Sequence, residues 1–311
     1  MREARLVSVV TPMLDEDGTA EEFYRRVCAA LDGVPFELVV VDDGSSDGTP
    51  GILAGLAERD ARVKVVELSR NFGHQTAITA GLDHATGDAV VMIDADLQDP
   101  PELIPTMLER WGDGADVVYA VRTEREGETR FKLATARWFY RLISKLAPID
   151  LREDAGDFRL LDRRALDALQ AMRERNRYLR GMTVWIGFTQ TAVPYKRDAR
   201  YAGETKFSLT RMLRFSLDAI ASFSHLPLQI ATLVGFAVAA FAFLMIPVAV
   251  VFRIAGQFVP GVTTTIIAVL LLGGIQLMAI GVIGEYVGRI YDEVKARPLY
   301  FVSRRHNLPD G

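Results

Sequence analysis

Residues 89–96 read Ala-Val-Val-Met-Ile-Asp-Ala-Asp, an unbroken apolar run that ends in two aspartates one residue apart. The run predicts a buried β-strand, and carboxylates at i and i+2 of a strand lie on the same side. We therefore expect Asp94 and Asp96 to present oxygen ligands at the mouth of this strand, with the Gln98 amide as a third. Such a set suits Mg²⁺ or Mn²⁺ that also bridges to a substrate diphosphate. Solvated turn acids are the alternative interpretation.

The rest of the first 200 residues alternates between short apolar runs and stretches with helical spacing. Strands are expected at Leu6–Val10, Phe36–Val41, Val63–Leu68, Ala89–Ile93, Val117–Val121, Gly156–Leu161 and Val184–Pro194. Helices are expected at Thr19–Leu31, Pro50–Arg59, Gln75–Ala85, Pro101–Trp111, Arg130–Leu146 and Arg164–Met172. This alternation predicts an α/β fold with a doubly wound, mostly parallel sheet.

Polar residues follow several of these strands. Asp42, Arg70, Asp94 and Arg122 each come directly after the carboxyl end of a predicted strand. Ligands of open α/β sheets bind at that edge. We therefore expect these four strand ends to converge on one polar site.

Two of the predicted loops offer groups that suit a nucleotide. The turn Asp42-Asp43-Gly44-Ser45 has carboxylates that can accept hydrogen bonds from a base or a ribose, although a polar turn that caps a helix explains it equally well. Arg70, Asn71 and His74 could donate to phosphate oxygens. For His74 an ordinary surface histidine is the simpler interpretation.

Asp157 is an acid in an apolar context, within Gly156-Asp157-Phe158-Arg159. It is a candidate base or orienting group, and a structural salt bridge to Arg159 or Arg163 is the alternative. A dianionic partner needs several cations, and the arginine fork suits phosphate. The candidates for this role are Arg122, Arg130, Arg200 and Lys206.

Composition excludes some classes of function. The chain has 311 residues and a net charge of −4, so nothing suggests a nucleic-acid partner. The single cysteine, Cys28, excludes an internal disulfide and a cysteine metal cluster. The N-terminal apolar run is too short for a signal peptide.

Two long apolar stretches, Leu226–Phe252 and Val262–Ile283, predict a hairpin of two transmembrane helices. Their alternative is a pair of buried helices in a soluble protein. Arg253, in the loop between them, is the only charged residue of 226–283, whereas basic residues flank the pair on both sides, so both termini are expected in the cytoplasm. Before them, Phe207–Phe223 has the spacing of an amphipathic helix at the membrane surface.

The expected organisation has four parts. Residues 1–206 form a catalytic domain, 207–225 an amphipathic juxtamembrane helix, 226–285 two transmembrane helices, and 286–311 a cytoplasmic C-terminal tail. The protein is then a multi-pass protein of the inner (plasma) membrane.

Five motifs occur together in this chain and carry a family likeness. They are Asp42-Asp43-Gly44-Ser45, residues 94–102, Gly156-Asp157-Phe158-Arg159, Gly203-Glu204-Thr205-Lys206, and Ile283-Gly284-Glu285-Tyr286-Val287-Gly288-Arg289. Together they resemble the bacterial polyprenyl-phosphate glycosyltransferases of glycosyltransferase family 2, relatives of dolichol-phosphate-mannose synthase. The likeness covers nearly the whole chain.

The resemblance implies a GT-A fold, an inverting mechanism, a nucleotide-sugar donor, a polyprenyl (undecaprenyl) phosphate acceptor and a homotetramer. It implies Mg²⁺ or Mn²⁺ on Asp94, Asp96 and Gln98. It implies nucleotide-sugar contacts at Thr11, Pro12, Asp42, Asp43, Arg70, Asp94, Ala95 and Asp96. It places Arg122 and Arg130 near the acceptor phosphate, and Arg200 and Lys206 in a closing loop. As a hypothesis of mechanism, Arg122 and Arg130 aim the acceptor phosphate in catalysis, and Asp157 orients the acceptor or the sugar or acts as a weak base. The loop Thr11–Glu16 departs from the Pro-x-Tyr-Asn-Glu-Glu of many relatives.

The identity of the sugar stays open at this stage. UDP-glucose is the favoured donor, and UDP-galacturonate, UDP-aminoarabinose and GDP-mannose are alternatives. A processive polysaccharide synthase and a non-catalytic membrane scaffold or sugar-nucleotide sensor are the competing functions. The two short spans argue against the synthase, and the complete acidic and basic motifs argue against the scaffold.

Overall fold

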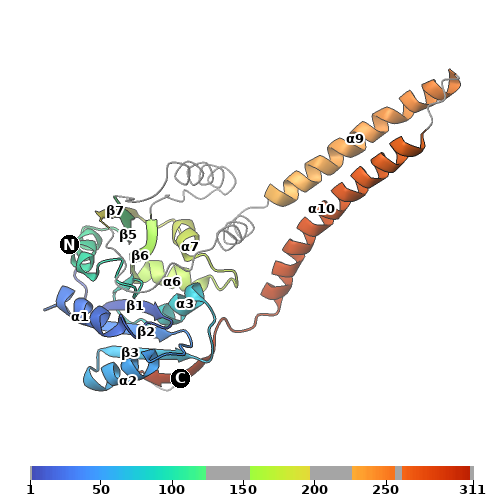
Figure 1. Cartoon of the computed structure of the whole chain (residues 1–311). Coiled ribbons are helices and arrows are strands. Elements are labelled where there is room, and N and C mark those ends of the chain that lie inside the picture. Colours follow the sequence, from blue (N-terminus) through green and yellow to red (C-terminus); the bar gives the residue numbers. More distant parts are fainter. Residues whose placement is uncertain (1, 124–154, 197–225, 256–260, 309–311) are drawn as a thin grey trace. The chain divides into compact units, whose positions relative to one another are not determined.

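The computed structural model describes residues 2–123, 155–196, 226–255 and 261–308 (Figure 1). The chain divides into two compact units, which are described separately. The sheet unit comprises Met1–Ser144, Ile149–Ser208 and Pro298–Gly311. The hairpin unit comprises Lys145–Pro148 and Leu209–Arg297. The expected helices at Arg130–Leu146 and Phe207–Phe223 lie outside the described residues.

Within the described residues, eight strands form one sheet in the order β7-β5-β6-β4-β1-β2-β3-β8. The strands are β1 (Val7–Met13), β2 (Phe36–Asp42), β3 (Val63–Leu68), β4 (Ala89–Met92), β5 (Val117–Arg122), β6 (Ala155–Asp162), β7 (Gln190–Tyr195) and β8 (Val302–His306). β6 and β8 run antiparallel to their neighbours, and the other strands run parallel to one another. The carboxyl ends of β1 to β5 and β7 therefore meet the amino end of β6 at one edge. The predicted α/β fold with a mostly parallel sheet is confirmed.

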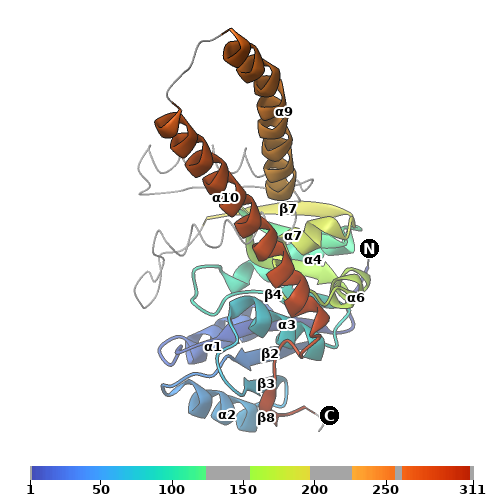
Figure 2. The same cartoon turned by 90° about the vertical axis from the view of Figure 1, so that its right-hand side faces the viewer.

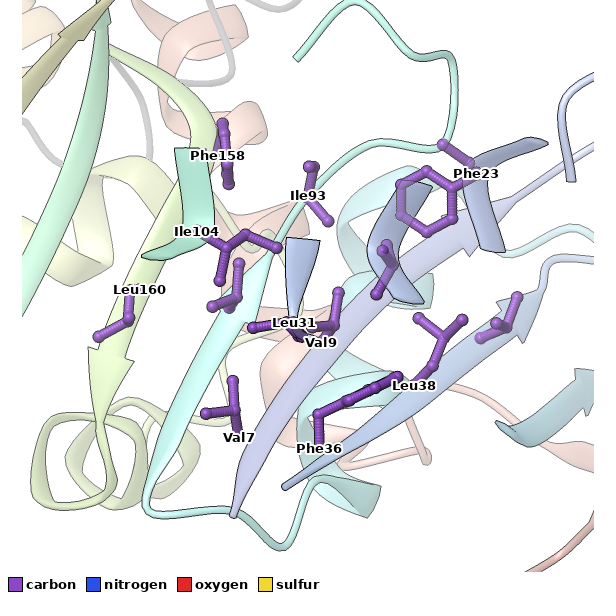
Figure 3. Packing of buried hydrophobic residues seen from close by; sticks show 14 of the residues in the cluster. Val7, Val9, Phe23, Leu31, Phe36, Leu38, Ile93, Ile104, Phe158 and Leu160 are labelled. Atoms are coloured by element: carbon purple, nitrogen blue, oxygen red, sulfur yellow. The ribbon is translucent and has the colours of Figure 1, made fainter. Parts of the chain in front are cut away.

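Helices cover both faces of the sheet. They are α1 (Ala20–Ala30), α2 (Thr49–Arg59), α3 (His74–His84), η1 (Pro101–Leu103), α4 (Ile104–Gly112), α6 (Arg163–Ala171) and α7 (Leu179–Trp185). Leu38 and Val40 of β2 belong to a core that includes α1, α2 and α4, part of which Figure 3 shows. Val41, the next residue, packs in a second core with Ala77 and Ala80 of α3. Burial on both faces explains why β2 is an unbroken apolar run.

The expected strand at Val184–Pro194 is wrong in its first part. Residues Leu179–Trp185 form α7, and β7 covers only Gln190–Tyr195. The sequence Met182-Thr183-Val184-Trp185-Ile186 has the β-branched composition of a strand. However, Leu179, Met182 and Thr183 are buried at helical spacing, so tertiary packing decides the local structure.

The segment after the second long helix returns to the sheet unit. β8 pairs antiparallel with β3 and forms the edge of the sheet, beside α2 in Figures 1 and 2. Asn307 donates from Nδ2 to the carbonyls of Ala57 at 2.7 Å and Val63 at 2.9 Å. Tyr300 donates to Asp83 at 2.9 Å. Part of the expected tail at 286–311 is thus an integral strand, which its polar sequence did not reveal.

The hairpin unit contains α9 (Leu226–Ile254) and α10 (Val262–Val294), which pack against each other. Both are long and apolar enough to cross a membrane, with candidate spans at Leu228–Met245 and Ile267–Val294. Their apolar side chains are exposed within the described residues, for example Phe236 at 71%. A buried core helix would not expose them, which argues against the soluble alternative.

Candidate functional site

The candidate site lies at the sheet edge where β4 and β5 end and β6 begins. Because β6 runs antiparallel to both, its first residues lie beside the ends of its two neighbours. This topology brings Asp157 of β6 to the turn that follows β4. His74, the first residue of α3, lies between them, with Nε2 3.4 Å from Asp94 Oδ1 and 3.7 Å from Asp157 Oδ2. The histidine interpreted as an ordinary surface residue therefore contacts two of the candidate acids.

The acidic residues follow β4 in a turn. β4 ends at Met92, one residue before the predicted end of the strand, so both carboxylates lie in the turn and not on the strand itself. Asp94, Asp96 and Gln98 are nevertheless partly exposed, while the residues between them are buried. The Gln98 amide N–H donates to Asp96 Oδ1 at 3.1 Å, and Leu97 has φ +59°. A buried leucine in the left-handed region indicates backbone strain, which proteins keep mostly at functional sites.

The electrostatics of this turn favour a cation. Burial, together with the nearby carboxylates of Asp157, Asp99 and Asp96, raises the pKa of Asp94 to about 6. Asp94 Oδ1 is buried and has no hydrogen-bond partner in the described part of the chain. Among the described residues, no three His, Cys, Asp or Glu side chains are grouped so that they could hold a metal. Asp94 and Asp96 are the kind of oxygen ligand that a divalent cation would share with substrate oxygens.

Asp157 is held by a cation that the sequence analysis did not single out. Arg180 of α7 binds it with both nitrogens, Nε to Oδ1 at 2.7 Å and Nη2 to Oδ2 at 2.9 Å. Burial would raise the pKa of Asp157, but the Arg180 charge and hydrogen bonds from His74 and Arg180 hold it well below its usual range. The expected alternatives Arg159 and Arg163 instead bind other groups, namely Thr183 and Gly156 for Arg159 and the carbonyls of Ala85 and Gly87 for Arg163.

Arg122 lies at the end of β5, as expected. Its Nε donates to the Tyr195 hydroxyl at 3.1 Å, and Tyr195 in turn donates to Asp99. Arg122 Nη2 lies 3.8 Å from Asp99 Oδ1. A guanidinium and a row of acids therefore face the same edge of the sheet, which suits a substrate with a phosphate and a bound cation.

The turn after β2 packs on the loop after β3. Asp43 accepts hydrogen bonds from the backbone N–H groups of Phe72 at 2.7 Å and Gly73 at 2.9 Å, so its carboxylate holds the loop. Asp42 accepts from the Ser45 amide at 3.1 Å. Gly44 has φ +77°, and a Cβ there would lie 2.7 Å from the Arg70 carbonyl carbon. Only glycine allows this approach of the two backbones.

The remaining predicted residues are placed as follows. Arg70 stacks on the Phe72 ring at 3.9 Å. Thr11 and Pro12 lie in β1 beyond its pairing with β4, and Thr11 Oγ1 is buried without a partner within the described residues. Ala95 is buried in the acidic turn. Arg130, Arg200 and Lys206 lie outside the described residues.

Three residues of the site were missed by sequence reasoning. Asp99 continues the acidic turn and could have been added from its position before Pro100. Arg180 and Tyr195 belong to no recognisable sequence motif. Only the tertiary fold brings them to the acids. Among several arginines between 173 and 180, nothing in the sequence distinguishes Arg180.

Comparison with known proteins adds independent information. The profile described as Glycosyl transferase family 2 matches residues 8–170. An uncharacterized glycosyltransferase of Bacillus subtilis is 48% identical over 97% of this chain and 94% of its own length. A prophage bactoprenol glucosyl transferase homolog of Escherichia coli is 42% identical over 96% of this chain and 98% of its own length.

A solved structure shares the fold of the sheet unit. Glucosyl-3-phosphoglycerate synthase from Mycobacterium tuberculosis, in complex with Mn²⁺, UDP and phosphoglyceric acid, matches with a TM-score of 0.50. The match covers 70% of this chain and 76% of that one at 23% identity. This likeness confirms the GT-A fold expected from the sequence.

Proposed function

The chain belongs to glycosyltransferase family 2, and we propose that it transfers glucose from a nucleoside diphosphate donor to polyprenyl phosphate with inversion. UDP-glucose is the donor we favour. The proposal is supported by relatives named bactoprenol glucosyl transferase, which match at about 42% identity over nearly their full length. The observation in this chain that carries it is the pairing of the acidic turn with Arg122 at one edge of the sheet.

The acceptor in this proposal needs little deprotonation. A phosphate monoester has a second pKa near 6, so it is largely dianionic at neutral pH. A strong general base is therefore not required, and the remaining tasks are positioning and charge neutralisation. Asp157 is consistent with a mechanism without a strong base, because Arg180 keeps its carboxylate ionised and bound in an ion pair. We assign it the orientation of a substrate rather than proton abstraction.

The donor would bind above the acidic turn. Asp94 and Asp96, with the Gln98 amide, would hold Mg²⁺ or Mn²⁺, which when bound stabilises the departing nucleoside diphosphate. The nucleoside would lie toward Asp42 and Arg70, where Gly44 lets two backbones approach. The buried Oδ1 of Asp94, which accepts no hydrogen bond in the described part of the chain, supports the cation.

Arginine side chains would bind and orient the phosphate of the acceptor. Arg122 supplies a fixed guanidinium at the end of β5, and guanidinium forks bind phosphate oxygens well. Arg130, Arg200 and Lys206 are proposed on the family resemblance to add charge on the acceptor side.

The hairpin would anchor the protein in the membrane that contains the lipid acceptor. α9 and α10 have the length and hydropathy of membrane spans. The sheet unit contains residues from both before α9 and after α10, because β8 pairs with β3. If the helices span the bilayer, both of their outer ends therefore lie on one side. The distribution of basic residues favours the cytoplasmic side.

A donor screen tests the function directly. The full chain, purified in detergent, is incubated with undecaprenyl phosphate and radiolabelled UDP-glucose, UDP-galacturonate, UDP-aminoarabinose or GDP-mannose. We expect label from UDP-glucose in the lipid fraction, only when the lipid phosphate is present. Label released to water at the same rate with and without lipid, or no transfer from any donor, would contradict the proposal.

A further inference from the structure

Arg122 is held in one orientation by a chain of hydrogen bonds that crosses the sheet edge. Its Nε donates to the Tyr195 hydroxyl, and that hydroxyl donates to Asp99. Tyr195 is the last residue of β7, the strand that pairs with β5, so the two residues are adjacent partners in the sheet register. A hydroxyl has one proton, so Tyr195 can serve both neighbours only in this direction.

Asp99 is the buried acceptor at the end of this series of hydrogen bonds. Its side chain is only 2% exposed, and a buried carboxylate needs compensating donors. Tyr195 and Arg122 supply them, with Arg122 Nη2 3.8 Å away. Burial and the Asp99 charge raise the pKa of Tyr195 to about 12, so the hydroxyl stays protonated at neutral pH.

The same turn carries Asp99 and the proposed cation ligands. Asp99 comes three residues after Asp96, and Ala95 and Leu97 between these acids are buried. Movement of Arg122 relative to the acidic turn would therefore require the Asp99 carboxylate to lose donors in a buried place.

We propose that Tyr195 and Asp99 are positioning residues that fix the guanidinium of Arg122 against the acidic turn, so that it receives the acceptor phosphate. This inference rests on the proposed function and names residues for its acceptor side. Both residues act through Arg122 and neither contacts the substrate. The competing explanation is that Tyr195 only fastens β7 to the turn.

Tyr195→Phe tests the inference with a matched control. Tyr24→Phe removes another tyrosine–aspartate hydrogen bond, from Tyr24 to Asp60 at 2.9 Å, on the opposite part of the sheet unit. We expect Tyr195→Phe to lower kcat/KM for polyprenyl phosphate about tenfold, the size of one lost hydrogen bond to a charged group. The KM for the nucleotide sugar is expected to stay unchanged, and Tyr24→Phe is expected to match the unmodified protein in both. Asp99→Asn should resemble Tyr195→Phe.

A double-mutant cycle separates positioning from a general structural effect. If Tyr195 acts through Arg122, adding Tyr195→Phe to Arg122→Gln changes the acceptor kinetics by less than about twofold. A full tenfold effect in that background, or equal losses toward donor and acceptor, would overturn the inference. So would a Tyr195→Phe protein that behaves like Tyr24→Phe. Failure of the unmodified protein to glycosylate polyprenyl phosphate would instead overturn the proposed function.

Discussion

Arg180 donates hydrogen bonds to both carboxylate oxygens of Asp157, at 2.7 and 2.9 Å. The carboxylate is 10% exposed and Arg180 is 32% exposed, so the pair is largely shielded from water. Because the pKa of Asp157 lies well below its usual range, the group is ionised at every pH at which the enzyme would work. The ionisation of Asp157 should therefore depend on Arg180.

Arg180→Gln is expected to give the activity a new acidic limb. Without the guanidinium, burial is opposed mainly by His74, so the pKa of Asp157 rises from its low value. The kcat of the variant should therefore decline more steeply than that of the unmodified protein as the pH falls below neutral. Arg173→Gln, which breaks the exposed pair with Asp83, is the control and should leave the profile unchanged. Parallel profiles for all three proteins would show that Arg180 does not control Asp157.

Asp94→Asn is expected to move activity and stability in opposite directions. The raised pKa of about 6 means that the folded state pays for an ionised Asp94 at pH 7 when no metal is bound. Neutralising it should stabilise the metal-free protein by about 1–2 kcal/mol, after allowance for its partial exposure. Turnover should fall at least about 100-fold, because a proposed cation ligand is lost.

Thermal unfolding in a chelator and transfer assays with Mg²⁺ or Mn²⁺ measure the two effects. Chelation should also abolish transfer by the unmodified protein, and added metal should restore it. A variant that loses stability together with activity would indicate that Asp94 serves the fold. Full turnover of the unmodified protein in the chelator would contradict the proposed role of a metal.

The apolar strands and the edge where the site lies could be predicted because they depend on local sequence. The run before Asp94 is buried on both faces of the sheet, so its residues show the strand directly. The antiparallel direction of β6 is set by its neighbours and leaves no local signal. That direction is what brings Asp157 to Asp94, and the fold of α7 adds Arg180. The strand β8 was not predicted because its sequence is polar, and an edge strand needs few apolar residues.

Gly44→Ala is expected to destabilise the loop contact between β2 and β3. A Cβ at Gly44 would meet the backbone of Arg70 and Asn71 at 2.7 and 2.8 Å, and φ is +77°. Gly33→Ala is a matched control, with φ +74° but no atom within 4 Å. Gly33→Ala should cost about 1–2 kcal/mol from backbone strain alone. Gly44→Ala should cost more and raise the KM for the nucleotide sugar. Equal losses of stability would show that the close approach adds nothing.

Glu37→Gln is expected to make stability less dependent on acid pH. Burial would raise the pKa of Glu37, but hydrogen bonds from Lys64, Ser8 and Thr86 outweigh it and hold the pKa below 4.5. The stabilisation by the carboxylate is therefore complete above about pH 4.5 and is lost as pH falls through the lower folded pKa. Removing the charge should cost about 3 kcal/mol at pH 7, near the low end for a buried pair.

Unfolding of the full chain, followed by tryptophan fluorescence at pH 7 and below pH 4.5, measures this difference. The gap between the unmodified protein and Glu37→Gln should narrow as the pH falls. Glu22→Gln, which removes an exposed partner of Arg25, should unfold like the unmodified protein at both pH values. A gap for Glu37→Gln that is constant with pH would show that the charge of Glu37 is not what stabilises the fold.

The pairing of β8 with β3 predicts the topology of the hairpin. After Cys28→Ser, single cysteines are introduced at Glu3, Gln257 and Arg304, and a membrane-impermeant maleimide is applied to intact cells. Gln257, between α9 and α10, should label at once, whereas Glu3 and Arg304 should label only after permeabilisation. Glu3 and Arg304 must share one side, because both belong to the sheet unit. Labelling of Arg304 and Glu3 from opposite sides would be incompatible with β8 as a strand of this sheet.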